Sequence, residues 1–208
     1  MKKILLVDDH MIVRSGIKTL LAEIYKPCEI HEAGEGDAVV EKLKEHTYDL
    51  IMMDVQMPKT DTLGLMEFIH VRHPDTKVLI FSMSPEKIYG RRFLKAGARG
   101  FISKDAPLDE VTKAINLIFS DRIYISDAMA QIMAHESFSD KDDNPFNKLS
   151  SREFEIATLL LAGHTVSEIS RALNLQASTV GTHKSRMFEK LRVNNLLELK
   201  ELSLSHNL

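Results

Sequence analysis

Five short apolar runs alternate with helix-like segments over the first 120 residues of the chain. Between the runs, apolar residues recur three and four positions apart, which is the spacing of an amphipathic helix. This alternation predicts a parallel β-sheet with helices on both faces, because a helix joins each strand to the next. The expected strands span residues 3–7, 29–33, 50–54, 77–81 and 100–103.

The third run is the most informative, because a charged residue follows it at once. Leu50 to Met53 are all apolar, and Asp54 comes next. An unbroken apolar run is typical of a parallel strand buried on both faces, so Asp54 would stand at the carboxyl edge of the sheet. Ligands bind at that edge in open α/β sheets. Taken alone, the aspartate could equally well end the strand and begin a turn.

Polar residues follow three more of the expected strands at the same edge. Asp8 and Asp9 come after the first strand, Ser82 ends the fourth, and Lys104 follows the fifth. We expect these side chains to converge with Asp54. Crowded carboxylates repel each other unless a cation joins them, and Mg²⁺, which prefers oxygen ligands, is the natural candidate.

The expected pocket suits phosphoryl transfer. A carboxylate can accept a phosphoryl group as a covalent aspartyl phosphate, and Asp54 is the central candidate. Mg²⁺ held by Asp8 and Asp9, together with the Lys104 ammonium, would neutralise the charge of the transferring group, while the Ser82 hydroxyl would donate to it. Each residue alone is a common turn or surface residue, so the prediction depends on their joint placement at matched strand ends.

The stretches LLVDDH, MMDVQMP, FSMS and KAGARGFISKD resemble, in order and spacing, the motifs of the response-regulator receiver domain. The resemblance implies a flavodoxin-like, doubly wound fold with a five-stranded parallel sheet. It also implies that Asp54 accepts a phosphoryl group from a sensor histidine kinase, and that Ser82 and Phe101 form a switch pair. The implied Mg²⁺ ligands are Asp8, Asp9, Asp54 and the backbone carbonyl of Gln56.

The chain departs from this family pattern at three positions. Lys59 and Thr62 stand where glycine is usual, so the loop after Asp54 could take a different path, and Lys59 could bring a second cation to the site. Met83 stands where alanine is commonest, and its bulk could narrow the approach to Asp54 and slow phosphoryl exchange. These departures keep open an alternative in which the receiver acts only as a phosphorylation-independent dimerisation or inhibitory module.

The chain changes character near residue 148. Residues 149–208 hold seven Lys/Arg against six Asp/Glu and no strand-like run, whereas residues 1–148 hold 20 against 24. A polar, acidic stretch broken by a proline precedes the change, which is typical of a linker. Two modules with different partners are therefore expected. The predicted parts are a receiver at 1–121, a linker with a short helix at 122–147 and a helical domain at 148–208.

Four helices are expected in this last part. Ser150 or Ser151 would cap the first and Gly163 would end it. A second helix is expected at 165–173, and Ser178 would cap a third that runs to about Leu191. Two helices joined by a tight turn form a helix-turn-helix candidate.

The third of these helices is the expected DNA-recognition helix. Val180, Met187 and Leu191 mark its buried face, and its exposed N-terminal part would enter a major groove. Basic and hydroxyl side chains there suit phosphates and base edges, although charge alone does not exclude a solvated face. The predicted contacts are Thr179, Gly181, Thr182, Lys184, Ser185, Arg186 and Lys190.

The order of these signals resembles the LuxR-type DNA-binding domain over nearly all of residues 148–205. With the receiver, it implies a transcriptional response regulator of the NarL/FixJ type that binds double-stranded DNA and forms a homodimer on phosphorylation. Many members carry lysine at the positions of Gly181 and some at Ser185, so the base preference stays open. The last helix, at about 196–204, commonly supports dimers, and internal packing is an equally plausible role.

Other classes fit less well. An aspartyl-phosphate hydrolase of the haloacid-dehalogenase kind needs a second aspartate in the motif, which DVQMP lacks, so the chain is not predicted to be an enzyme beyond its own phosphorylation and dephosphorylation. A Rossmann protein would need a glycine-rich loop after the first strand. The lone Cys28 excludes an internal disulfide. No stretch approaches the roughly 18 apolar residues of a membrane span, and a cytoplasmic protein is expected.

Overall fold

The computed structural model describes residues 1–57, 59–138 and 144–206. Contacts between residues divide the chain into two compact units, Met1–Ser137 and Phe138–Leu208. No helix among the described residues combines the length and apolarity needed to cross a bilayer.

The N-terminal unit is built on a five-stranded sheet in which every pair of neighbouring strands is parallel, in the order β2-β1-β3-β4-β5. This confirms the strands and the sheet type expected from the apolar runs. The strands are β1 Lys2–Val7, β2 Cys28–Ala33, β3 Leu50–Met53, β4 Lys77–Ser82 and β5 Gly100–Ser103. The helices between and after them are α1 Met11–Ile24, α2 Gly36–Glu45, α3 Thr62–Arg72, α4 Glu86–Lys95 and α5 Leu108–Phe119.

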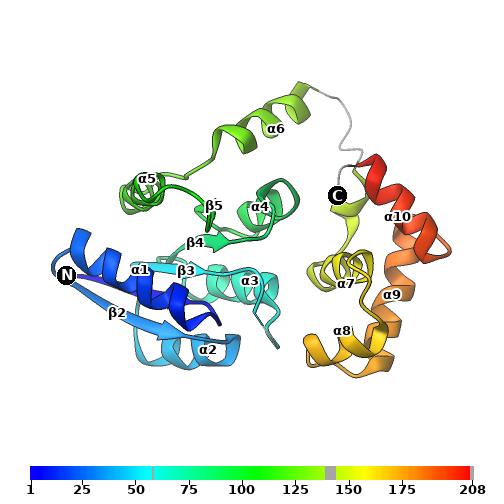
Figure 1. The fold of residues 1–208 in the computed structure, drawn as a ribbon, viewed down its shortest axis with the longest axis horizontal. Helices are drawn as coiled ribbons and strands as arrows, with labels where there is room; N and C mark the ends of the chain where they lie inside the picture. Colours follow the sequence, from blue (N-terminus) through cyan, green and yellow to red (C-terminus); the bar gives the residue numbers. More distant parts are fainter. Residues whose placement is uncertain (58, 139–143, 207–208) are drawn as a thin grey trace. The chain divides into compact units, whose positions relative to one another are not determined.

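Helices cover both faces of this sheet (Figure 1). Each face has its own core of buried side chains. Side chains of α2, α3 and α4 pack on one face and those of α1 and α5 on the other. Along β3, Ile51 and Met53 enter the first core while Leu50 and Met52 enter the second, because successive strand residues point to opposite faces. Burial of each such side chain contributes about 1.5–3 kcal/mol, which explains why the run has no polar residue.

The segment after α5 is part of the N-terminal unit. Tyr124 is buried, and its backbone N–H donates to the carbonyl of Arg99 at 2.8 Å. The Ser126 hydroxyl donates to Glu86 at 2.6 Å. In helix α6, Asp127–Phe138, the buried Met129 lies on Gly90 of α4, where an added Cβ would come within 2.6 Å of the Met129 methyl group. The helix expected within the linker is therefore packed on α4.

The described residues of the C-terminal unit form helices and no strand, as expected. These helices are the 3₁₀ helix η1 Pro145–Lys148, followed by α7 Ser151–Leu161, α8 Val166–Ala172, α9 Ala177–Leu191 and α10 Leu196–Ser205. Val180, Met187 and Leu191 are buried, which confirms the predicted inner face of α9.

Local signals explain both ends of α7 but not the start of α9. Ser150 caps α7 in a capping box with Glu153, and Gly163, at φ +92°, follows the end of that helix. The Ser178 cap is wrong: α9 begins at Ala177 after Gln176, whose carbonyl accepts from the N–H of Val180. Ser178 therefore lies inside the first turn, where its own carbonyl accepts from the Thr182 hydroxyl.

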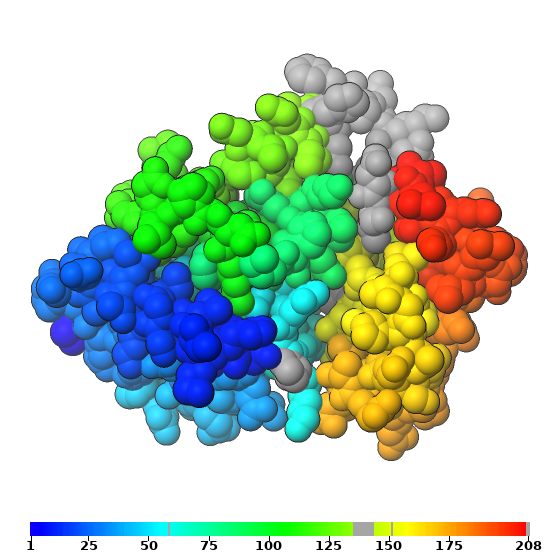
Figure 2. Space-filling model, viewed as in Figure 1, coloured from blue at the N-terminus to red at the C-terminus, as the bar shows by residue number. Residues whose placement is uncertain are grey.

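Helix α10 leaves apolar side chains on the surface of its unit. Leu197 and Leu204 are each 67% exposed, while Leu199 is fully buried against the rest of the unit. The helix is coloured red in the space-filling view of Figure 2, and much of it lies at the surface there. Its inner face packs on α7. The helix therefore has buried residues for internal packing and exposed leucines for an apolar contact surface, the two roles considered for it.

Candidate functional site

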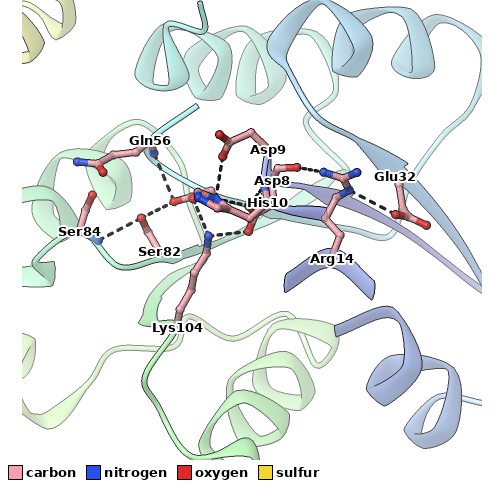
Figure 3. A network of polar contacts seen from close by, with 10 residues as sticks. Asp8, Asp9, His10, Arg14, Glu32, Gln56, Ser82, Ser84 and Lys104 are labelled. Carbon is pink, nitrogen blue, oxygen red and sulfur yellow. Dashed lines mark hydrogen bonds and ion pairs between the residues drawn. The ribbon is translucent and has the colours of Figure 1, made fainter. Parts of the chain in front are cut away.

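Four strand ends bring polar side chains into one pocket (Figure 3). Asp54 follows β3, and its backbone N–H donates to the carbonyl of Val7 at 2.9 Å. The Lys104 ammonium lies 2.6 Å from a carboxylate oxygen of Asp8 and 2.6 Å from one of Asp54. The Ser82 hydroxyl donates to the other oxygen of Asp54. The convergence expected from the strand register is therefore present.

The pocket is buried and holds its charges in contact. The side chains of Lys104, Asp8 and Asp54 are 8%, 7% and 5% exposed. Burial opposes the charge of Lys104, but its hydrogen bonds with Asp54 and Asp8 outweigh that effect and raise the pKa of Lys104 above its ordinary value. The ammonium therefore stays charged at neutral pH and offsets part of the repulsion between the two carboxylates.

The donor set of this pocket suits a hard divalent cation. Asp8, Asp9, His10 and Asp54 each offer a ligand atom, and these atoms all lie within 4.8 Å of one another. Carboxylate oxygens are the ligands that Mg²⁺ prefers, so the residues present fit that ion. The backbone N–H of Gln56 donates to Asp54 at 3.3 Å, which keeps Gln56 beside that carboxylate.

His10 is a neighbour that the sequence analysis did not single out. Its ring nitrogen Nδ1 lies 3.2 Å from Asp8 and 3.0 Å from Asp9. Its backbone N–H also donates to Asp8, at 2.8 Å. The signal was available in the stretch VDDH, where the histidine directly follows the two aspartates.

The loop after Asp54 accommodates the residues that replace the family's glycines. Lys59 adopts φ 58°, in the left-handed region that favours glycine, and its side chain is exposed. Thr62 is buried, and its hydroxyl donates to the carbonyl of Val55 at 2.7 Å. The Thr60 hydroxyl accepts from the N–H of Gly36 at 2.9 Å. The Lys104 ammonium, by contrast, lies in the pocket, 2.6 Å from Asp54.

The residues of the expected switch pair are both turned inward. Phe101 is buried in the core on the α4 side, with its ring centre 6.4 Å from that of Phe93. Ser82 already donates to Asp54, and its oxygen accepts from the N–H of Ser84 at 3.2 Å. The Ser84 hydroxyl is itself buried with no hydrogen-bond partner among the described residues. Sequence reasoning did not single out Ser84.

Helix α9 presents only part of its predicted DNA-contact set on its surface. Thr182, Ser185, Arg186 and Lys190 are exposed, and Lys184 is half-buried. The Lys184 ammonium lies 5.3 Å from the ring centre of Phe188. The Lys190 ammonium lies 2.6 Å from the buried carboxylate of Glu153, so it has a structural partner within its own unit. The other two residues of the set, Thr179 and Gly181, are half-buried.

Comparison with known proteins agrees with both units. A model of the response regulator receiver domain matches residues 4–116, and one of the luxR family of bacterial regulatory proteins matches residues 147–202. The response regulator GacA of Pseudomonas syringae pv. syringae (strain B728a) is 38% identical over 209 residues, which cover 100% of this chain and 98% of GacA. The chain belongs to the response-regulator family. The response regulator UvrY of Escherichia coli (strain K12) is 35% identical and is covered to 96%.

Solved response-regulator structures show the same fold. RcsB from Salmonella enterica serovar Typhimurium, bound to promoter rprA in the presence of the phosphomimetic BeF3-, matches with a TM-score of 0.70. A second RcsB structure, bound to promoter P1flhDC, matches with a TM-score of 0.68. Both are 22% identical and cover 97% of each chain. The receiver of this response regulator is therefore the flavodoxin-like sheet, followed by a LuxR-type helical domain.

Met83 of this response regulator lies beside the pocket with its side chain 60% exposed. We expect Met83→Ala to speed both phosphorylation and dephosphorylation of the receiver, by roughly twofold to fivefold, because alanine would open the approach to Asp54 without touching it. Rates with a small phosphoryl donor, followed by intact-protein mass, measure the effect. Leu108→Ala, which removes another exposed apolar side chain from the receiver, is the control. Equal rates in wild type and Met83→Ala would refute the prediction.

Glu153 of the LuxR-type domain forms an ion pair with Lys190, and this pair predicts that the stability of the domain depends on pH. Burial opposes its charge, but hydrogen bonds from Lys190 and Ser150 lower the pKa of Glu153 below its ordinary value of 4.5. Its contribution to stability is thus complete above pH 4.5 and is lost as the pH falls through the lowered pKa. We expect Glu153→Gln to destabilise this domain by about 2 kcal/mol at neutral pH.

Native-state hydrogen exchange of the α7 and α9 amides in the full chain measures this difference across pH. The gap between Glu153→Gln and wild type should close in acid, where both side chains are neutral. Glu189→Gln, on the exposed side of α9, is the matched control and should change little. A gap that persists unchanged in acid would contradict the ion-pair explanation.

Proposed function

We propose that this protein is a phosphorylation-controlled transcription regulator and that Asp54 is its phosphoacceptor. The observation that carries the proposal is the pocket in which Asp54 is held between Lys104 and Ser82, with Asp8 and Asp9 beside it. A carboxylate so placed is a nucleophile surrounded by the groups that phosphoryl transfer requires. The same pocket dephosphorylates the receiver, and no other catalysis is proposed.

The transfer itself is a simple displacement. One carboxylate oxygen of Asp54 attacks the phosphorus of a phosphohistidine on a sensor histidine kinase. A P–O bond forms, the P–N bond breaks, and its electron pair leaves with the imidazole nitrogen. Mg²⁺, held by Asp8, Asp9, Asp54 and the Gln56 carbonyl, would supply positive charge for the transferring oxygens.

The residues around Asp54 then meet the new group. The Lys104 ammonium exchanges its contact with the carboxylate for a phosphoryl oxygen, and the Ser82 hydroxyl donates to another. The buried Ser84 hydroxyl offers a further donor next to Ser82. Phe101 keeps the inward position that accompanies the inward Ser82, and this stabilises the phosphorylated form of the receiver.

The output is DNA binding through α9. The phosphoryl group adds about −1.5 to −2 charge to the receiver, which changes its dimerisation and so the binding of paired half-sites in double-stranded DNA. Exposed leucines on α10 offer an apolar surface for a homodimer. We propose 1–121 for the sheet and helices of the receiver, 122–147 for a linker whose helix α6 packs on the receiver, and 148–208 for the DNA-binding domain. Because its target is the chromosome, the protein acts in the cytoplasm.

Intact-protein mass after incubation with Mg²⁺ and acetyl phosphate tests the proposal. Wild type should gain one phosphoryl group, Asp54→Asn should gain none, and omission of Mg²⁺ should prevent the gain. Asp75→Asn, the same change at an exposed turn after α3, is the matched control and should behave as wild type. If wild type gains nothing, even from a phosphorylated histidine kinase domain, the receiver is instead a phosphorylation-independent dimerisation or inhibitory module.

A further inference from the structure

Arg14, in the first turn of α1, contacts both Asp8, which follows β1, and Glu32 on the edge strand β2 (Figure 3). One terminal nitrogen of its guanidinium donates to the backbone carbonyl of Asp8. Its Nε lies 3.3 Å from a carboxylate oxygen of Glu32 on β2. The side chain is only 16% exposed, so these contacts are sheltered from solvent.

The carbonyl that Arg14 binds lies where the sheet no longer supplies a partner. The last register pair of β1 and β2 is Val7 with Ala33, and the N–H of Asp8 donates to the Ala33 carbonyl at 3.1 Å. The Asp8 carbonyl lies beyond that pair, and the guanidinium takes it up. Both backbone groups of Asp8 therefore have partners, which fixes the direction of the Cα–Cβ bond that carries its carboxylate.

Glu32 has a second cationic partner, which does not contact the Asp8 carbonyl. The Lys18 ammonium lies 2.6 Å from the other oxygen of the Glu32 carboxylate. The hydrogen bond from Lys18 lowers the pKa of Glu32 most, and the one from Arg14 lowers it further; burial opposes both. Both cations contact Glu32, but among the residues that the structure describes only the Arg14 side chain donates to the Asp8 carbonyl.

We propose that Arg14 is a positioning residue for the divalent-cation site of the receiver. Anchored by Glu32, it holds the backbone of Asp8, and with it the neighbouring Asp9, in the arrangement that lets their carboxylates bind one cation together. A lysine cannot replace it, because the role needs two donors in one rigid fork, one for Glu32 and one for the Asp8 carbonyl. The inference rests on the metal site of the proposed function and adds a residue that binds neither metal nor phosphoryl group.

Charge and position predict opposite effects when Arg14 is removed. By charge alone, loss of a nearby cation would tighten binding of a divalent metal. Loss of the positioning contact would instead weaken it, since partners that orient metal ligands typically account for about tenfold to a hundredfold in affinity. The sign of the change therefore separates the proposed role from a general electrostatic one.

Mn²⁺ binding to the full chain, measured by electron paramagnetic resonance without any phosphoryl donor, tests the inference. We expect Arg14→Ala and Arg14→Lys each to weaken Mn²⁺ binding about tenfold or more. Lys18→Ala, which removes the other cation on Glu32, should leave it within about twofold of wild type. Thermal unfolding of each variant identifies the temperature range in which it is folded, and Arg14→Lys, which retains the charge, serves if Arg14→Ala does not fold.

Unchanged or tighter Mn²⁺ binding in folded Arg14→Lys would overturn the inference. An equal loss in Lys18→Ala would overturn it too, because the effect would then belong to Glu32 and not to the Asp8 carbonyl. The failure of this inference can be told apart from the failure of the proposed function. If wild type binds Mn²⁺ but accepts no phosphoryl group, only the phosphoacceptor proposal is refuted. If wild type is phosphorylated and the Arg14 variants bind Mn²⁺ with full affinity, only the role of Arg14 is refuted.

Discussion

Lys104→Met will lower the rate at which Asp54 is phosphorylated by about a hundredfold or more, and it will also destabilise the receiver at neutral pH. The ammonium contacts carboxylate oxygens of both Asp8 and Asp54 at 2.6 Å. Methionine keeps most of the stem but removes the charge, so two buried carboxylates are left facing each other. Breaking a buried pair in this way typically costs about 3–5 kcal/mol.

The pH range of this effect follows from the raised pKa of Lys104. A group whose pKa is raised on folding contributes its full stability below its ordinary value, here 10.5, and loses it as the pH rises through the folded value. The destabilisation should therefore be complete at neutral pH. Mg²⁺ should restore part of the stability, because the ion would replace the lost positive charge between the carboxylates.

Chemical unfolding with and without Mg²⁺ measures the stability, and intact-protein mass after exposure to acetyl phosphate measures the phosphorylation. Lys113→Met, at an exposed position of α5, is the matched control and should change neither. A Lys104→Met receiver as stable as wild type without Mg²⁺ would show that the ion pair does not hold the pocket together. A normal phosphorylation rate would remove Lys104 from the transfer.

Ser185→Glu will weaken binding of duplex DNA by about tenfold to a hundredfold while leaving the fold of the LuxR-type domain intact. Ser185 is exposed on α9 beside Arg186, on the side of the helix away from the buried Val180, Met187 and Leu191. A carboxylate there would face DNA phosphates if this side of the helix enters the groove. Because the side chain is exposed, the substitution should change the free energy of unfolding by less than about 0.5 kcal/mol.

Fluorescence anisotropy with a labelled duplex of mixed sequence at low salt measures the loss, since the affinity for phosphates does not require a known site. Lys200→Glu on α10 is the control, because it makes the net charge two units more negative at an exposed position of another helix. It should cost much less affinity than Ser185→Glu. Equal losses in the two variants would mean that overall charge, and not the face of α9, governs binding.

Local sequence patterns were enough to predict the sheet, the helical tail and the meeting of Asp8, Asp54, Ser82 and Lys104. These features follow from strand register and helical period, which are properties of short stretches. The cap of α9 was predicted wrongly at Ser178, because hydroxyl residues also occur within a first turn, and Gln176 begins the helix through its backbone alone.

Pairings between distant residues were beyond what the patterns could predict. Lys190, which stays a predicted DNA contact, also has its ammonium on the buried carboxylate of Glu153, 37 positions earlier in the chain, and the sequence did not indicate this pairing. Arg14 binds the Asp8 carbonyl and Glu32 because α1 turns back along the sheet. Such partners depend on how elements pack, and a lone basic residue carries no sign in the sequence of which acid it will meet.

The packing of Met129 on Gly90 determines where this regulator can be truncated and where its domains can be exchanged. A fragment cut after residue 121 would lose Tyr124 from over Gly100 and Met129 from over Gly90, and would leave apolar surface of α4 and β5 open to water. A soluble autonomous receiver should therefore be cloned to residue 137, where the N-terminal unit ends. Chimeras that exchange the DNA-binding domain should likewise be joined beyond α6, so that this helix of the linker stays packed on the receiver.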